Sequence, residues 1–127
     1  MNPESLRAWL ESYRLAWEAR NPEAVGRLFA EDATYQETPF TRPMQGRGAI
    51  QQYWSDVVAA AQEQIRFGYE VLASREDSAI VHWWASFVRI ASRAQVGLDG
   101  IFLLSFDTAG HCRELREWWV RKDRKGE

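Results

Sequence analysis

The stretch AIVHWWASFVRIAS (residues 79–92) decides the fold, because it reads as one long β-strand with two apolar faces. Every second residue from Ala79 to Phe87 is apolar. The other face is also apolar apart from two polar members, and it carries Ile80, His82, Trp84, Ser86, Val88 and Ile90. A strand with one face in water alternates apolar with charged residues. Because that contrast is missing here, we predict that both faces of this strand are buried.

The segments on either side continue with a period of two. They are IRFGYEVLAS (65–74), RAQVGLDGIFLLSFD (93–107) and CRELREWWVRK (112–122), and the intervening REDS (75–78) and TAGH (108–111) have the composition of turns. Short turns join antiparallel neighbours, so these segments predict an antiparallel meander over about residues 65–122.

The residues before the meander predict three helices, over about 3–20, 22–30 and 47–62. Two Asn-Pro-Glu sequences, at 2–4 and 21–23, have the composition of helix starts. A short strand is expected around 34–37. Helices followed by a meander predict an α+β fold, a strongly bent antiparallel sheet wrapped round the N-terminal helices, and 127 residues suit one domain.

Bulk composition excludes several classes of partner. A net charge of −2 gives no electrostatic reason to bind nucleic acid or an anionic membrane, and the one basic run, Arg121 to Lys125, is expected to be a solvated tail. No apolar stretch is long enough to span a bilayer, and the N-terminus does not resemble a signal peptide. With the single cysteine Cys112, these features predict a cytoplasmic protein.

The alternation assigns side chains to the two faces of the sheet. We place Trp83, Phe87 and Phe102 on the concave side under the helices, which leaves Leu115, Glu117 and Trp119 on that side in the last strand. His82, Trp84 and Trp118 then lie on the convex side. Because the helices cover one face only, the convex face is predicted to pack on a second subunit in a homodimer.

A resemblance is carried by three pieces, YRLAWEARNPEAVGRLFAEDATYQETPF (13–40), QGRGAIQQYW (45–54) and the hairpin formed by GIFLLSFDTAG and CRELREWW (100–119). Together they resemble the nuclear-transport-factor-2-like superfamily and, within it, the SnoaL-like polyketide cyclase group. The resemblance implies a cone-shaped fold with a pocket at its open end. Members include isomerases, cyclases, dehydratases and epoxide hydrolases as well as proteins that only bind, so the fold does not choose the function.

Four residues are candidates for catalysis. Desolvation of an inward Glu117 would raise its pKa into the range of a general acid or base; the structural alternative is an inward Glu paired with an Arg or bonded to Tyr or Trp donors at the sheet edge. Tyr13 and Tyr35 would donate to a carbonyl or enolate oxygen, as in ketosteroid-isomerase-like relatives, or belong to the core. Glu37 falls where the family's pocket mouth would be, either as a second acid or, as we favour, as a solvated loop carboxylate.

Seven Trp, six Phe and four Tyr exceed what a small core needs, which indicates a cavity lined by rings, an oligomer interface, or both. We predict an apolar or aromatic small-molecule ligand and no metal or cofactor, since zinc spacings and phosphate loops are missing from the sequence. The alternative is a non-catalytic dimeric binding or interaction module. The residues predicted to contact the ligand are Trp17, Tyr53, Trp54, Trp83, Phe87, Phe102, Leu115 and Trp119.

Overall fold

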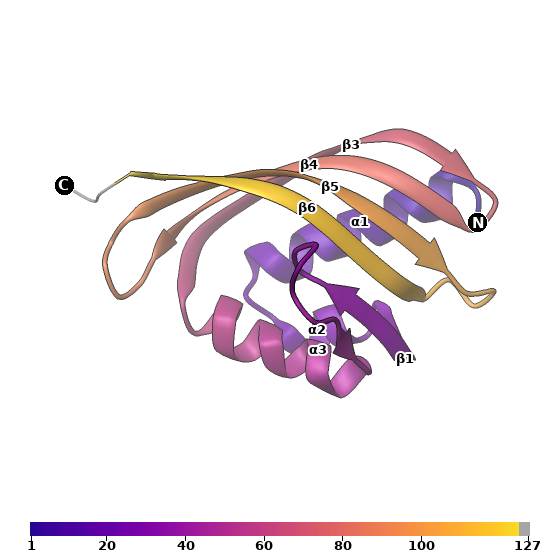
Figure 1. Ribbon diagram of the computed structural model, residues 1–127, viewed down its shortest axis with the longest axis horizontal. Coiled ribbons are helices and arrows are strands. Elements are labelled where there is room, and N and C mark those ends of the chain that lie inside the picture. Colours follow the sequence, from indigo (N-terminus) through magenta and orange to yellow (C-terminus); the bar gives the residue numbers. More distant parts are fainter. Residues whose placement is uncertain (125–127) are drawn as a thin grey trace.

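The computed structural model describes residues 1–124 as a bent six-stranded sheet that arches over its N-terminal helices (Figure 1). The strand order is β2-β1-β6-β5-β4-β3, and all neighbours are antiparallel except β1 and β6, which are parallel. The elements are α1 (Pro3–Glu18), α2 (Pro22–Gly26), β1 (Phe29–Gln36), β2 (Met44–Gln45), α3 (Arg47–Tyr53), the π-helix η1 (Trp54–Ala59), β3 (Gln62–Arg75), β4 (Ser78–Arg89), β5 (Gln95–Phe106) and β6 (Cys112–Arg124).

The predicted α+β architecture is confirmed, with three differences in the elements. The second helix ends at Gly26, because Phe29 and Ala30, predicted as helical, begin β1, where Phe29 pairs with Cys112 of β6. The third helix does not continue regularly to residue 62, since it changes to a π-helix at Trp54. The meander covers β3 to β6, from residue 62 to 124, and is longer than predicted.

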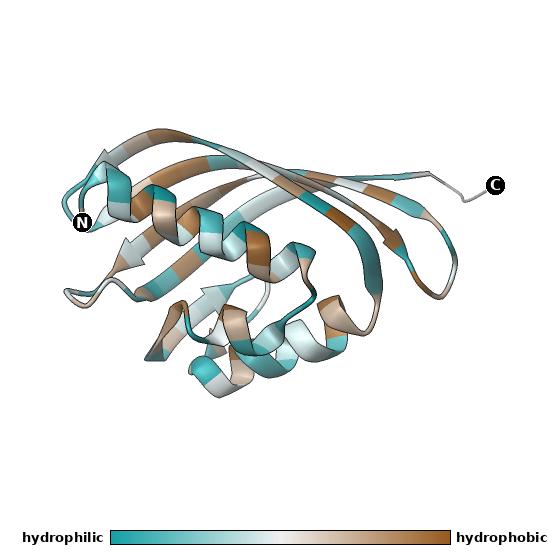
Figure 2. Ribbon diagram, turned by 180° about the vertical axis from the view of Figure 1, so that it is seen from behind, coloured by the Kyte–Doolittle hydropathy of each residue, from teal (hydrophilic) through white to brown (hydrophobic). Residues whose placement is uncertain are grey.

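Both Asn-Pro-Glu sequences do begin helices. The Asn2 side chain accepts a hydrogen bond from the Ser5 backbone N–H at 2.8 Å, and Asn21 accepts one from Ala24 at 3.1 Å. Each asparagine therefore satisfies a free N–H of the first helical turn. Apolar and polar positions alternate round α1 (Figure 2), and its buried side is larger than predicted, because Trp9 also lies in the core and donates to the Leu28 carbonyl.

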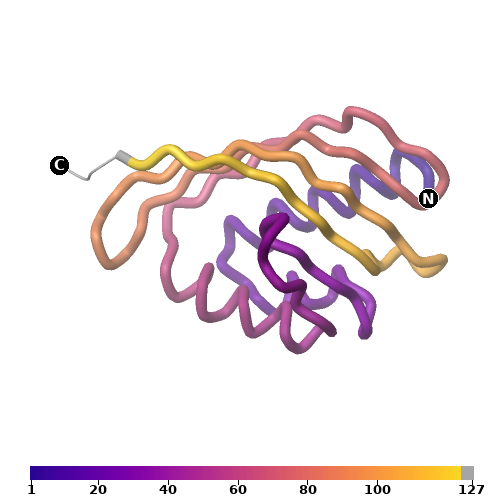
Figure 3. The backbone as a smooth tube through the Cα atoms, viewed as in Figure 1, coloured from indigo at the N-terminus to yellow at the C-terminus, as the bar shows by residue number. Residues whose placement is uncertain are grey.

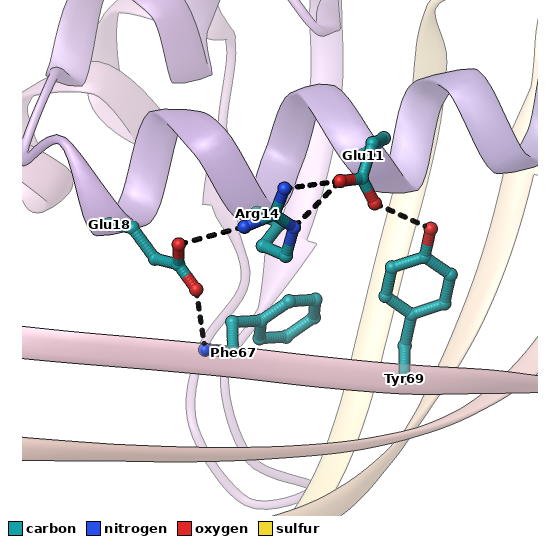
Figure 4. Close-up of polar contacts among 5 residues, drawn as sticks. All are labelled: Glu11, Arg14, Glu18, Phe67 and Tyr69. Atoms are coloured by element: carbon teal, nitrogen blue, oxygen red, sulfur yellow. Dashed lines mark hydrogen bonds and ion pairs between the residues drawn. The ribbon is translucent and has the colours of Figure 1, made fainter.

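A polar network fastens α1 to the edge strand β3 (Figure 4). Arg14 bonds both Glu11 and Glu18 on the helix. Glu18 accepts the backbone N–H of Phe67 at 2.9 Å, and Glu11 accepts the Tyr69 hydroxyl at 2.8 Å. The edge strand is thereby held against the helix that carries Tyr13 and Trp17.

The concave face of the sheet is the core. Its buried side chains alternate along β4, β5 and β6, as predicted, and Trp83 and Phe102 stack with ring centroids 5.1 Å apart. The start of α1 lies at one end of the sheet, while the last part of β6 extends towards the other end, beyond the helices (Figure 3). At that second end the concave face is not covered by α1.

Gly100 in β5 lies where its neighbours leave no room for a side chain. A Cβ atom at this position would lie 2.5 Å from the Trp118 carbonyl oxygen and 2.9 Å from a ring atom of Trp83. The close approach lets Trp83 lie flat across β5. Gly97, in the same strand, would place its Cβ atom no closer than 3.8 Å to the nearest atom.

We therefore expect Gly100→Ala to destabilise the protein by about 2 kcal/mol, because the added methyl group overpacks against backbone. Gly97→Ala is the matched control and is expected to leave the free energy of unfolding within about 0.5 kcal/mol of wild type. Urea unfolding followed by tryptophan fluorescence measures both. Equal stability of the two variants would contradict the packing described at Gly100.

Candidate functional site

A cavity of about 230 Å³ lies between the concave face of the sheet and the helices, at the uncovered end. Helix α1, strand β1 and the α3–η1 segment form one wall, and β3 to β6 form the other. Its lining residues are Tyr13, Trp17, Tyr35, Glu37, Tyr53, Trp54, Val57, Val58, Gln62, Trp83, Phe87, Arg89, Leu98, Glu117, Trp119 and Arg121.

All four predicted catalytic residues line this cavity, and so do six of the eight predicted ligand contacts. Phe102 and Leu115 do not. Both are fully buried in the core beneath the cavity, because the rings of Tyr13 and Trp83 cover Phe102 and neighbouring strands enclose Leu115. The cavity lining therefore does not include these two predicted contacts.

Glu117 is a buried carboxyl group among aromatic rings, with 6% of its surface exposed. Its register opposite Phe102 turns it to the concave side, between Leu115 and Trp119. Burial raises the pKa of Glu117 well above its usual value, the Tyr35 hydroxyl lowers it, and the charge of Glu37 raises it further. No Arg, Lys or His forms an ion pair with it among residues 1–123, so nothing offsets the burial that favours the neutral form of Glu117.

Tyr13 and Tyr35 extend this carboxyl into a chain of hydroxyl groups. Their oxygens lie 3.4 Å apart, and burial raises the pKa of both phenols, so both are protonated. Tyr13, Tyr35 and Glu117 together carry three O–H hydrogens, whereas contacts among the three groups use two. One O–H therefore remains to donate to an oxygen atom in the cavity.

Glu37 lies just after β1, half-buried at the cavity mouth. Its backbone carbonyl accepts the indole N–H of Trp119 at 2.8 Å, which fixes the end of β1 against β6. Burial raises the pKa of Tyr53, and the neighbouring Glu37 charge raises it further. Glu37 is thus a cavity residue, not the solvated loop carboxylate that we favoured from the sequence.

The π-helix η1 and the start of β3 complete the wall. A π-helix widens the turn by one residue, and here Trp54, Val57 and Val58 all reach the cavity. Gln62 accepts the indole N–H of Trp17 at 2.9 Å, which fixes the orientation of that ring. The sequence gives no signal for Gln62, because its position depends on where the helix stops and β3 begins.

Two cationic side chains at the mouth were also missed. Arg89 and Arg121 line the cavity. Arg121 is half exposed, as the prediction of a solvated run implied, but it lies within β6, and Lys125 lies outside the described residues. The alternation of side chains predicts the inward position of both. Arg89 is on the same face of its strand as Trp83 and Phe87, and Arg121 is on the same face as Glu117 and Trp119. The described residues contain no group of three His, Cys, Asp or Glu arranged to hold a metal ion.

Comparisons with known proteins agree with this architecture. A family model described as the SnoaL-like domain matches residues 6–115. The chain belongs to the SnoaL-like family. It is 24% identical over 118 residues to a steroid Delta-isomerase of Nocardioides simplex, covering 93% of this chain and 92% of that protein.

The fold of this SnoaL-like chain also matches the solved structure of SalBIII, an epoxide hydrolase/cyclase-like enzyme in pyran ring formation in the polyether salinomycin. The TM-score is 0.80 at 18% identity, with 94% of this chain and 95% of that chain covered. This structural match shows that the two chains share a fold. In the described part of the chain, no helix combines the length and apolarity required to cross a bilayer.

The burial of Glu117 predicts a pH dependence of stability. An unfolded chain ionises this group near pH 4.5, whereas the folded protein keeps it neutral because its pKa is raised. Below the pKa of Glu117 in the unfolded chain, the group is neutral in both states and the folded protein has its full stability. As the pH rises from there towards the pKa of Glu117 in the folded protein, only the unfolded chain ionises, and the free energy of unfolding falls. The Glu117→Gln variant does not carry this cost, so its advantage over wild type should grow by about 1.4 kcal/mol per pH unit from about pH 5 up to the folded pKa, and then stay constant.

Urea unfolding at a series of pH values measures this difference. Glu114→Gln is the matched control, since Glu114 lies on the same strand with an exposed side chain. Its curve against pH should run parallel to that of the wild type. A Glu117→Gln curve that also runs parallel would show that Glu117 ionises normally in the folded protein.

Proposed function

We propose that this protein is an enzyme that binds an apolar or aromatic small molecule and moves a proton beside its carbonyl group, as an isomerase does. The observation that carries the proposal is the neutral Glu117 carboxyl, joined to Tyr13 and Tyr35 and facing a cavity that also holds the Glu37 carboxylate. Two or more polar groups converging on a ligand-sized cavity favour catalysis over the alternative of a binding or interaction module.

The proton transfer divides between two groups. Because Glu117 is neutral, it donates a hydrogen bond and does not accept the proton, so the role of base falls to Glu37. Glu37 takes a proton from the carbon next to the carbonyl, and the electron pair of that C–H bond moves to the carbonyl oxygen. The O–H groups of Glu117, Tyr13 and Tyr35 stabilise the resulting enolate. Return of the proton to another carbon of the enolate completes an isomerisation without a further reactant.

The cavity also limits the size of the ligand. Pockets for drug-sized molecules have volumes of roughly 300–1,000 Å³, and this one, at about 230 Å³, is smaller. A ligand of one or two rings fits that volume. The aromatic walls suit an apolar ring system with one oxygen at its buried end.

The proposal is tested by proton exchange into cyclic ketones and by isomerisation of a β,γ-unsaturated ketone such as cyclohex-3-enone. NMR in deuterated water detects the exchange, and ultraviolet absorbance detects the conjugated product. We expect Glu37→Gln to lower kcat by about 10²–10⁴-fold, because it removes the base. Tyr13→Phe should lower kcat by about tenfold or more, because it removes a donor to the enolate.

Tyr69→Phe is the matched control, since its hydroxyl bonds Glu11 outside the cavity, and it should keep kcat within about twofold of wild type. Turnover that survives both Glu37→Gln and Tyr13→Phe would refute the proposed mechanism. Wild-type protein that exchanges no proton into any cyclic ketone would refute the enzymatic function.

We propose in addition that the protein forms a homodimer through the convex face of its sheet. This face exposes Ile80, Trp84, Trp118 and Val120, by 39–72% of their surface. His82 adds a polar centre, since its two ring nitrogens lie 3.0 Å from Glu70 and 3.1 Å from Asp99. Exposed apolar area of this kind on a sheet is costly in water and suits an interface.

The mass in solution tests this contact. Wild-type protein at tens of micromolar should have twice the monomer mass of 14.8 kDa by light scattering, and Trp118→Glu should shift it to monomer. Phe40→Glu, which changes a fully exposed aromatic residue in the loop between β1 and β2, is the control and should remain dimeric. A monomeric wild type would contradict the proposed homodimer.

A further inference from the structure

Two arginines lie at the cavity mouth, although the whole chain has a net charge of −2. They are Arg89 and Arg121, and the carboxyl groups near them are Glu37, in the cavity lining, and Asp123, which is bonded to Arg121. The proton transfer described above uses Glu37 and the hydroxyl chain only. It leaves the two arginines without a function.

Both guanidinium groups keep donors available. Arg121 uses Nε to bond Asp123 at 3.1 Å, which leaves its two terminal nitrogens. Arg89 lies over the ring of Phe87, 5.6 Å from the ring centre, and has no carboxylate within ion-pair distance among residues 1–124.

The two arginines approach the cavity from different strands. Arg89 is the last residue of β4, and Arg121 lies near the end of β6, with β5 between them. The walls between the arginines and Glu117 are apolar, formed by Phe87, Leu98 and Trp119. The cavity therefore has a donor at its buried end, an apolar middle and a cationic mouth.

The strand geometry gives the spacing of the two polar ends. Glu117 and Arg121 lie four residues apart on one face of β6, which is about 13 Å at a rise of roughly 3.3 Å per residue. A hydrogen bond of about 2.8 Å at each end leaves about 8 Å between the two polar groups of a ligand that touches both ends, the length of two fused rings.

We propose that the ligand of this cavity carries a carboxylate at the end opposite to its carbonyl oxygen, and that Arg89 and Arg121 bind this carboxylate at the mouth. A guanidinium group matches a carboxylate with two parallel N–H···O bonds, which gives orientation as well as affinity. The substrate class is then a one- or two-ring keto acid. This assignment rests on the proposed function for the oxygen at the buried end, whereas the carboxylate contact is measured separately.

Three related naphthalenes test binding at the buried end and at the mouth of the cavity separately. 6-Hydroxy-2-naphthoate carries a hydroxyl, which resembles an enol, and a carboxylate at its opposite ends; 2-naphthol lacks the carboxylate, and 2-naphthoate lacks the hydroxyl. Their dissociation constants follow from quenching of tryptophan fluorescence. We expect 6-hydroxy-2-naphthoate to bind wild-type protein about tenfold more tightly than 2-naphthol.

The double variant Arg89→Met, Arg121→Met should abolish that difference and leave the affinity for 2-naphthol unchanged, because methionine keeps the apolar stem of each side chain. Arg113→Met is the matched control; it removes a guanidinium from β6 outside the cavity, and the tenfold difference should persist. Thermal melting of all variants verifies that they are folded.

Equal binding of 6-hydroxy-2-naphthoate and 2-naphthol, or a difference that survives in the double variant, would overturn the carboxylate assignment. Failure of 6-hydroxy-2-naphthoate to bind at millimolar concentration would also overturn it. A failure of the proposed function gives a different pattern. In that case 6-hydroxy-2-naphthoate and 2-naphthoate bind equally and Tyr13→Phe changes neither affinity, while the effect of the arginines is still measured.

Discussion

The burial of one carboxyl group among aromatic rings is the interaction on which the site depends. Ionisation of Glu117 is costly beside Trp119 and beneath the helices, so burial favours the protonated carboxyl, which is a hydrogen-bond donor. Tyr13 and Tyr35 lie against it because α1 and β1 press on the concave face of the sheet. The chemistry of the cavity therefore follows from the packing of the core, and the two are not separable.

The bent sheet makes that burial compatible with an open cavity. Close approach at Gly100 lets Trp83 lie flat and fill the floor, and the network of Glu11, Arg14 and Glu18 holds α1 to β3. The π-helix then closes the side wall with Trp54 and Val58. Beyond the end of α1 the strands continue without a helix over them, and this is where Arg89 and Arg121 meet solvent and a ligand would enter.

The alternation of apolar and polar residues along the sequence predicts most of the sheet and of the cavity lining. It predicts the meander, the inward position of Glu117 and the convex position of Trp84, because the alternation of side chains leaves one choice once the core face is known. It also contains the inward positions of Arg89 and Arg121, which a reading of the basic run as a solvated tail overlooked. Phe102 and Leu115 share the inward parity, but parity does not tell a core residue from a cavity residue.

Other features depend on contacts between distant segments. The early end of the second helix follows from pairing of Phe29 with Cys112, and local propensity does not report that pairing. The place of Glu37 at the cavity mouth depends on the bond from Trp119 to its carbonyl, across 82 positions of the chain. Gln62 reaches the cavity through the change from π-helix to strand, for which the sequence has no recognised signal.

The protonation state of Glu117 in the folded protein tests the central claim most directly. Carbon-13 NMR of labelled glutamate side chains, assigned by comparison with the Glu117→Gln variant, follows the carboxyl carbon of Glu117 through a pH titration. We predict a signal that keeps the chemical shift of a neutral acid through neutral pH. A signal that titrates near pH 4.5, like that of an exposed glutamate, would contradict it.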